Sequence, residues 1–176
     1  MSIVITIFLD KISVAWYYFN VNEFKGKVKM NFNVKIKKLN EKAVIPTYGS
    51  PFSAGADLYA CEGGEVIVGA GETRLVRTGI ALEIPEGYVG LIYARSGISV
   101  KRGLAPANKV GVIDSDYRGE IMVALYNQSG KEQTVADGER IAQIVFTPYV
   151  AADFCVVDEL DSTERGEGGF GSTGRK

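Results

Sequence analysis

Strand-like runs, separated at short intervals by glycine or proline, fill most of this chain. The stretches EVIVGAGETRLVRTGIALEIPEGYVGLIYARSG (65–97) and GEIMVALYNQSGKEQTVADGERIAQIVFTPYV (119–150) are rich in β-branched and aromatic residues, with turn residues roughly every 8–12 positions. In the second stretch Ile121, Val123 and Leu125 share one strand face by the two-residue period. No long segment has the 3.6-residue period of an amphipathic helix. The pattern therefore predicts an all-β fold, a distorted barrel or sandwich of the jelly-roll kind, with at most a helical turn or two.

The β pattern predicts one domain over 30–157 with an extension at each end. The N-terminal extension, 1–29, has apolar runs interrupted by Asp10 and Lys11. These runs are too short to span a bilayer, and the segment lacks the basic start of a signal peptide. Met30 then opens a natural first strand. Two interpretations stay open: a mis-set start, because Lys-Gly-Lys-Val-Lys-Met can be encoded by a purine-rich ribosome-binding sequence, or a hydrophobic segment that docks on the domain or on a partner.

Composition excludes several classes of function. The 176 residues are 46% hydrophobic, which is enough for a core. Twenty cations against 21 anions favour neither nucleic acid nor membrane as a partner. Histidine is absent, which removes histidine triads and histidine zinc sites. Cys61 and Cys155 are far apart in sequence and are typical of a reducing cytoplasm rather than of a disulfide framework.

Two turn sequences in the first half of the domain carry polar residues of interest. SAGADLYA (53–60) places Asp57 after Gly55 and before an apolar strand; by itself this pattern favours an aspartate that caps its own turn. ARSGIS (94–99) places Arg95 and Ser96 at the end of an apolar strand. Backbone amides and a hydroxyl there could converge on an anion.

Two further sequences carry polar groups within strand-like runs. NKVGVIDSDYRGE (108–120) puts Asp114 directly after Val-Gly-Val-Ile, where a carboxylate is costly unless it is paired or used. GERIAQIVF (138–146) offers Arg140 and Gln143 on a strand that otherwise has core composition. Each observation alone is weak evidence for a site.

The last twelve residues, RGEGGFGSTGRK, combine glycines, one aromatic ring, hydroxyls and cations. A solvated tail is one interpretation. A dinucleotide fingerprint is excluded, because the chain ends before the helix that such a motif requires. A third interpretation is a flexible arm over 158–176 that closes over a ligand, with Phe170 stacking on a flat group and the cations meeting an anion.

Taken together and in this order, the five sequences resemble the trimeric dUTP pyrophosphatase (dUTPase) family, a β-clip fold. The resemblance runs from about Met30 to Lys176 and rests on SAGADLYA, ARSG, GVIDSDYRGE, GERIAQ and RGEGGFGSTG. One departure is Ala94, where the family usually has proline; losing that fixed φ angle could loosen the turn slightly. The resemblance implies a homotrimer with sites shared between subunits, and an arm that reaches a neighbouring subunit's site.

The resemblance implies hydrolysis of dUTP to dUMP and pyrophosphate, which limits uracil incorporation into DNA and supplies dUMP for dTMP synthesis. Asp114 would hold and deprotonate the attacking water and meet the 3′-hydroxyl. The groups expected along the triphosphate are Arg95, Ser96, Gly97 and Gln143, with Arg140 as a brace. Mg²⁺ would be held mainly by triphosphate oxygens and water, with Asp57 acting only indirectly.

The same resemblance implies how the base, the sugar and the terminal phosphate would be bound. A β-hairpin from about Leu104 to Val112 would read the edge of uracil and exclude thymine, and Tyr117 would pack on the deoxyribose and exclude a ribose. The other residues expected at the base are Asn108, Val112, Ile113 and Met122. The arm would supply Arg165, Phe170, Gly171, Ser172 and Thr173.

Three alternatives from other classes fit the sequence less well. A dCTP deaminase of the same fold needs a glutamate at the base, and none lies between Leu104 and Val112. A non-catalytic nucleotide-binding regulatory protein would not need Asp114 and the complete arm. A β-barrel interaction module with a disordered tail would require all five matches to be accidental.

Overall fold

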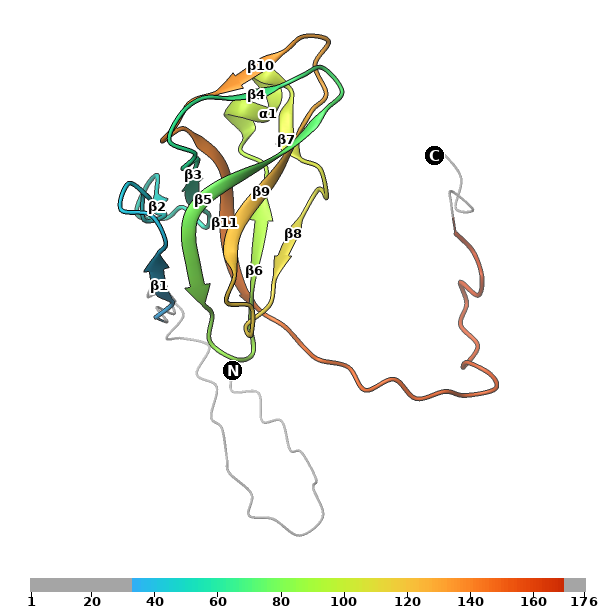
Figure 1. Ribbon diagram of the computed structural model, residues 1–176. Helices are drawn as coiled ribbons and strands as arrows, with labels where there is room; N and C mark the ends of the chain where they lie inside the picture. Colours follow the sequence, from blue (N-terminus) through green and yellow to red (C-terminus); the bar gives the residue numbers. More distant parts are fainter. Residues whose placement is uncertain (1–32, 170–176) are drawn as a thin grey trace.

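The computed structural model describes residues 33–169 and confirms the predicted all-β fold (Figure 1). The strands and the one short helix of these residues are, in chain order, β1 (Lys35–Lys38), β2 (Thr47–Tyr48), β3 (Ala56–Tyr59), β4 (Val66–Val68), β5 (Thr73–Glu83), β6 (Tyr88–Tyr93), α1 (Ser96–Arg102), β7 (Leu104–Pro106), β8 (Gly111–Ile113), β9 (Glu120–Asn127), β10 (Gln133–Val135) and β11 (Arg140–Pro148). The predicted extension 1–29 lies outside the described residues. In the described part of the chain, no helix has both the length and the apolar character needed to cross a membrane.

The strands form a jelly-roll-like β fold around one core. One sheet has the order β1-β5-β9-β7 and another β2-β3-β11-β6-β8, and β10 pairs with β4. Every pair is antiparallel. Figure 1 shows β5 and β9 curving over one side of the core while β6 and β11 cover the other. Leu58, Ile80, Ile121, Ile141 and Ile144 lie fully buried between them.

The alternation predicted for residues 121–126 is confirmed in β9. Ile121, Val123 and Leu125 are buried, whereas Met122 is 38% exposed on the opposite face. Removing each aliphatic side chain from water contributes about 1.5–3 kcal/mol, so this face fixes which side of β9 meets the core. Met122 is thereby directed outward from the core.

The hairpin predicted over about 104–112 is wrong in its pairing. Here β7 pairs with β9 while β8 pairs with β6, so the two strands belong to different sheets. The connection between them is a tight turn in which the Lys109 amide donates to Pro106 O at 3.0 Å, with Lys109 at φ 65°. The longer partner strands β6 and β9 hold β7 and β8 apart, because each short strand gains its backbone hydrogen bonds from its long neighbour.

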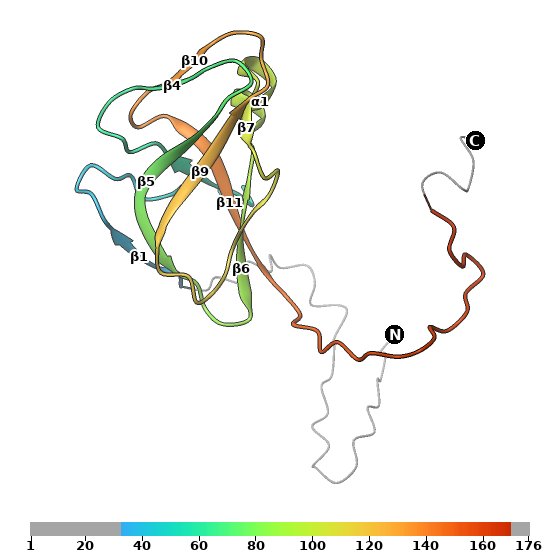
Figure 2. The ribbon, with the colours of Figure 1, turned by 45° about the vertical axis from the view of Figure 1, so that its right-hand side comes forward.

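The chain leaves the barrel after β11. Residues 149–169 contain no strand or helix. The Tyr149 amide still donates to Gly87 O at 3.1 Å, and the segment after it runs away from the sheets in both ribbon views (Figures 1 and 2). Five large apolar side chains of this segment are exposed, most of them almost completely: Val150, Phe154, Val156, Val157 and Leu160. Within the described chain this segment therefore contributes nothing to the core.

Candidate functional site

Asp57 is the centre of an ionic cluster at one end of the five-stranded sheet. The residue lies within β3, only 8% exposed, and so is not the self-capping turn residue that its local sequence favours. Its Oδ1 accepts from Arg95 Nε at 2.6 Å and its Oδ2 accepts from Arg140 Nη1 at 3.3 Å. A buried carboxylate is costly unless it is paired, and these two guanidinium groups satisfy both of its oxygens. Asp57 therefore holds two cations in place.

The chain turns from β6 into α1 beside this cluster. Arg95 is the N-cap residue with extended backbone, but its side chain reaches Asp57 instead of capping the helix. Ser96 and Gly97 form the exposed first turn. A Cβ placed on Gly97 would meet no atom within 4 Å, so the backbone there is open to an approaching ligand. The first amides of a helix have no intrahelical acceptor and can donate outward.

Gln143 on β11 completes this part of the site. Its Nε2 donates to Ala94 O at 2.9 Å, and its side chain crosses closely over Gly55. A Cβ on Gly55 would lie 2.5 Å from Gln143 Oε1 and 3.2 Å from Gln143 Cβ. This position therefore requires glycine for the side chain to keep its course.

These residues line one cavity of about 500 Å³. The structure thus brings together groups from three of the sequences singled out above, and the members predicted as site residues are Asp57, Arg95, Ser96, Gly97, Arg140 and Gln143. The two guanidinium groups outnumber the one carboxylate among them. We call this the cationic cavity, because its lining favours an anionic ligand.

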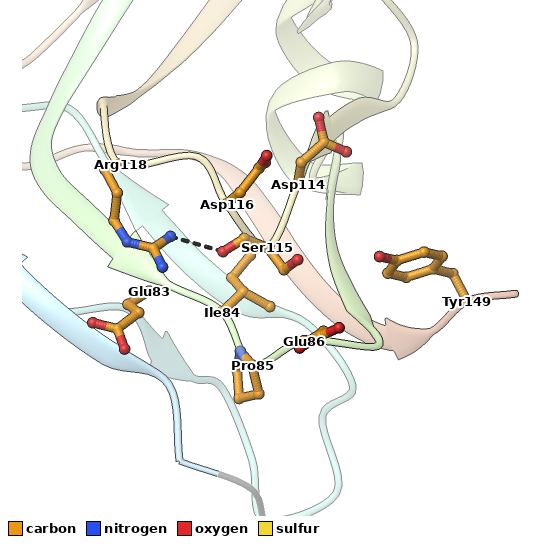
Figure 3. A pocket seen from close by; sticks show the side chains of 9 residues that line it. All are labelled: Glu83, Ile84, Pro85, Glu86, Asp114, Ser115, Asp116, Arg118 and Tyr149. Carbon is orange, nitrogen blue, oxygen red and sulfur yellow. Dashed lines mark hydrogen bonds between the residues drawn. The ribbon is translucent and has the colours of Figure 1, made fainter. Parts of the chain in front are cut away.

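Asp114 lies in a different cavity, of about 670 Å³, shown in Figure 3. The residue is exposed directly after β8, so the cost of burial inferred from its sequence context does not arise in the single chain. Four carboxylates and one guanidinium line this second cavity, which we call the acidic cavity; they are Glu83, Glu86, Asp114, Asp116 and Arg118. The two cavities share no lining residue.

The turn that carries Asp114 is fixed by backbone and side-chain hydrogen bonds. Arg118 Nη1 donates to Ser115 O at 2.7 Å, as Figure 3 shows, and the Tyr117 amide donates to Asp114 O at 3.2 Å. Sequence reasoning did not single out Arg118, although it lies within GVIDSDYRGE.

Glu83, another residue of the acidic cavity, is paired with a cation. The Lys35 ammonium donates to Glu83 Oε1 at 2.8 Å and lowers the pKa of that carboxyl below its ordinary value.

The residues predicted for the base and sugar line neither cavity. Asn108 is exposed in the turn between β7 and β8, and Val112 is exposed on β8. Ile113 is partly buried against the core and so, unlike Asn108 and Val112, is not fully exposed. Tyr117 donates through its hydroxyl to Glu120 O at 3.1 Å, with its ring over Gly119.

The predicted arm residues are only partly described. Arg165 is exposed, and its Nε donates to Gly168 O at 2.8 Å. Phe170, Gly171, Ser172 and Thr173 lie outside the described residues. In the described ranges, no group of three or more Asp, Glu or Cys side chains could hold a metal ion.

Comparisons with known proteins agree with this fold and with the motifs. The family model described as dUTPase matches residues 41–174. The deoxyuridine 5'-triphosphate nucleotidohydrolase of Nautilia profundicola is 50% identical over 142 residues, which cover 81% of this chain and 99% of that protein. The enzyme of the same name from Syntrophotalea carbinolica is 48% identical over 141 residues, 80% of this chain and 96% of that protein.

Solved structures show the same likeness. A dUTPase of Staphylococcus bacteriophage 80alpha, solved with dUpNHpp, superposes with a TM-score of 0.74 at 29% identity and covers 82% of this chain and 99% of its own. A dUTPase from phage phi11 of S. aureus, described as coordinating a structural Mg(II) ion, has a TM-score of 0.66 at 25% identity, covering 73% and 98%.

The chain therefore belongs to the dUTPase family, a class of nucleotide hydrolases. The two relatives that are 48% and 50% identical over most of the chain are both named as enzymes that hydrolyse deoxyuridine 5'-triphosphate. This chain is a dUTP diphosphatase, an enzyme that hydrolyses dUTP.

Proposed function

We propose that the enzyme hydrolyses dUTP to dUMP and pyrophosphate by attack of an Asp114-activated water on the α-phosphorus. The observation that supports the binding of the triphosphate is the cationic cavity, in which two guanidinium groups surround the buried Asp57 beside the open first turn of α1. The role of Asp114 is proposed from the motif resemblance. Phosphoryl transfer needs little covalent help from a protein. It needs an oriented water, neutralised charge and in-line geometry.

The triphosphate is bound in the cationic cavity. Ser96, through its hydroxyl and amide, and the Gly97 amide donate to phosphate oxygens, since both residues are exposed in the first turn. Arg95 adds positive charge, and Gln143 approaches the phosphate chain. Arg140 braces Asp57 from the other side, which keeps the carboxylate from repelling the phosphates.

Mg²⁺ fits this site as an ion that arrives with the triphosphate. Both oxygens of Asp57 already accept from guanidinium groups, so this carboxylate is suited to contact water around the ion and not to bind the ion directly. When bound, Mg²⁺ supplies charge neutralisation along the phosphates. The phi11 neighbour is described as coordinating a structural Mg(II) ion, so a protein of this fold binds this metal.

Asp114 acts as the general base. Its exposed carboxylate accepts a proton from water as that oxygen forms a bond to the α-phosphorus, and the bond from the α-phosphorus to the bridging oxygen breaks. The electron pair leaves with pyrophosphate, whose charge the Ser96 hydroxyl and the Gly97 amide stabilise. Asp114 also accepts from the 3′-hydroxyl of the sugar.

The base and sugar are recognised by the segment around β8. Backbone groups near Asn108 read the uracil edge, and Val112, Ile113 and Met122 line the base pocket, where a 5-methyl group is excluded. The Tyr117 ring packs on the deoxyribose, and its hydrogen bond to Glu120 O fixes it so that a 2′-hydroxyl is rejected. The arm adds Arg165, Phe170, Gly171, Ser172 and Thr173 over the bound nucleotide.

The functional assembly is a homotrimer with sites shared between subunits. Two observations support this proposal. The Asp114 carboxylate lies outside the cationic cavity of its own chain, which is compatible with a site that takes Asp114 from one copy and the cationic cavity from another. The exposed apolar side chains of the segment after β11 are also suited to pack on a neighbouring copy. The enzyme works in the cytoplasm, where it limits uracil incorporation into DNA and supplies dUMP for dTMP synthesis.

A substrate panel tests the proposed reaction. We expect the full chain with Mg²⁺ to release pyrophosphate from dUTP, with far slower turnover of dTTP and UTP and no ammonia from dCTP. Pyrophosphate and ammonia are measured in parallel, with and without excess chelator. Ammonia release from dCTP would identify a deaminase of the same fold, and binding of dUTP without either product would indicate a regulatory nucleotide-binding protein.

Gly55→Ala tests the packing of the cationic cavity. Because the new Cβ would overlap Gln143, we expect that side chain to shift and kcat/KM for dUTP to fall about 10-fold, within the range for a misplaced contact. Gly64→Ala is the matched control, since a Cβ there would meet no atom within 4 Å. Equal activity of the two variants would show that the position of Gln143 does not affect turnover.

A further inference from the structure

Arg102, the last residue of α1, joins this helix to the chain that leads into β11. Its Nε donates to Gln133 Oε1 at 3.2 Å, its Nη1 to Glu139 Oε1 and its Nη2 to Thr134 O. The side chains of Arg102 and Glu139 are each only 28% exposed. One guanidinium group thus ties the end of the helix to three residues of a distant segment.

Glu139 connects Arg102 to the cationic cavity. Its second oxygen, Oε2, accepts from the Ala136 amide at 3.0 Å, and its carbonyl accepts from the Ala60 amide at 2.8 Å. The next residue along the chain is Arg140, which pairs with Asp57. Glu139 is therefore held on both sides immediately before the strand that carries Arg140 and Gln143.

The opposite end of α1 is tied to the same place. Arg95, the N-cap residue, donates through Nη1 to Arg140 O at 3.4 Å and through Nε to Asp57. Residues 139 and 140 thus receive one guanidinium group from each end of the helix. The loop that follows the helix packs closely on a further segment, since a Cβ placed on Gly103 would lie 2.9 Å from Ser129 N.

The length of α1 makes these ties important. It has seven residues, which is about two turns, and a helix this short is not stable by itself. Its orientation, and with it the orientation of the Ser96 and Gly97 amides, must come from tertiary contacts. Ile98 anchors the middle of the helix in the core, and the guanidinium groups of Arg95 and Arg102 fix its two ends. Arg102 and Glu139 do not line the cationic cavity, so any effect on the reaction acts through position.

We propose that Arg102 and Glu139 are positioning residues of the hydrolysis, which hold α1 so that its first turn faces the phosphates in the geometry of the transition state. This inference rests on the proposed role of Ser96 and Gly97. A pair that only stabilised the fold would raise the melting temperature without affecting kcat. A positioning pair sets kcat in molecules that are already folded.

Three variants test the pair: Arg102→Lys, Arg102→Met and Glu139→Gln. We expect kcat at saturating dUTP and Mg²⁺ to fall about 10-fold in Arg102→Met and Glu139→Gln, with KM changed less than about 3-fold. Arg102→Lys should recover part of the loss, because it keeps the charge toward Glu139 but cannot reach all three acceptors. The double variant should be no slower than the slower single variant, as expected for two residues that act as one unit.

Val76→Ala is the matched control for stability. Val76 is fully buried in β5, across from Val123, and does not line the cationic cavity. Its truncation is expected to lower the melting temperature. Its kcat should stay within about 2-fold of the wild type. Folding is followed by circular dichroism, and Arg102→Lys with the near-isosteric Glu139→Gln decides the result if Arg102→Met does not fold.

Two results would overturn the inference: unchanged kcat in the folded Arg102 and Glu139 variants, or an equal fall in kcat for Val76→Ala. A rise in KM alone would also overturn it, because the loss would then be in ground-state binding. These outcomes differ from a failure of the proposed function, in which the wild-type enzyme itself would not release pyrophosphate from dUTP.

Discussion

Replacing Asp114 with Asn is expected to lower kcat for dUTP by roughly 10²–10⁴-fold, the usual cost of losing a general base. Asparagine keeps the shape of the side chain and can still contact a hydroxyl, but it cannot accept the proton of the attacking water. Asp114 is exposed at the end of β8, so the melting temperature should change little. Single-turnover assays and titration with a non-hydrolysable dUTP analogue separate chemistry from binding.

Asp116→Asn is the control that the chain itself offers. Asp116 is an exposed carboxylate in the same turn and lines the same acidic cavity, so general changes of charge affect both variants alike. We expect its kcat to stay within about 3-fold of the wild type, because it is not the base. Near-normal turnover of Asp114→Asn, or an equal loss in Asp116→Asn, would refute the assignment.

Mixing of variants tests whether two chains form one site. Asp114→Asn chains and Ser96→Ala chains should each be slow, but reassembled mixtures should regain part of the activity. A site that combines Asp114 from one chain with Ser96 from another is intact in such a mixture. No recovery in verified hybrids would indicate that both cavities of one chain serve the same nucleotide.

The sequence predicts best those features that depend on local periodicity. The two-residue alternation of Ile121, Val123 and Leu125 specifies both the strand and its buried face, and the structure confirms both. The structural role of Asp57 could not be predicted from its local sequence, because that sequence favours a turn. Only the tertiary pairing with Arg95 and Arg140 shows why a carboxylate is buried there.

Other features could not be inferred from the sequence because they arise between distant segments. The separation of β7 and β8 depends on competition with the longer strands β6 and β9, which no local pattern reports. The Arg102–Glu139 pair joins residues 37 positions apart. No local pattern distinguishes Arg102 from other basic residues. The motif resemblance groups Arg95, Ser96 and Gln143 along one ligand, and the structure places them in one cavity.

Truncation after Glu164 is expected to leave the fold intact and to remove most of the turnover. Beyond Tyr149, the described part of the segment after β11 lies apart from the barrel (Figure 2). Its last residues are therefore not needed for the core, and the melting temperature should be unchanged. If the arm closes over the nucleotide, its loss admits water and removes several phosphate contacts together. Because one misplaced phosphate contact can cost about 10²-fold, kcat/KM should fall by at least that factor.

Two substitutions at Phe170 separate the stacking contact from the rest of the arm. Phe170→Ala should be milder than truncation, since it removes one base-stacking contact of roughly 1–3 kcal/mol and leaves Arg165 and the hydroxyls of Ser172 and Thr173. Phe170→Trp should keep much of the stacking, and its fluorescence should change when a non-hydrolysable dUTP analogue and Mg²⁺ are added. If truncation preserves activity and this fluorescence stays constant, RGEGGFGSTGRK is a solvated tail, and closure over the phosphates must come from another segment.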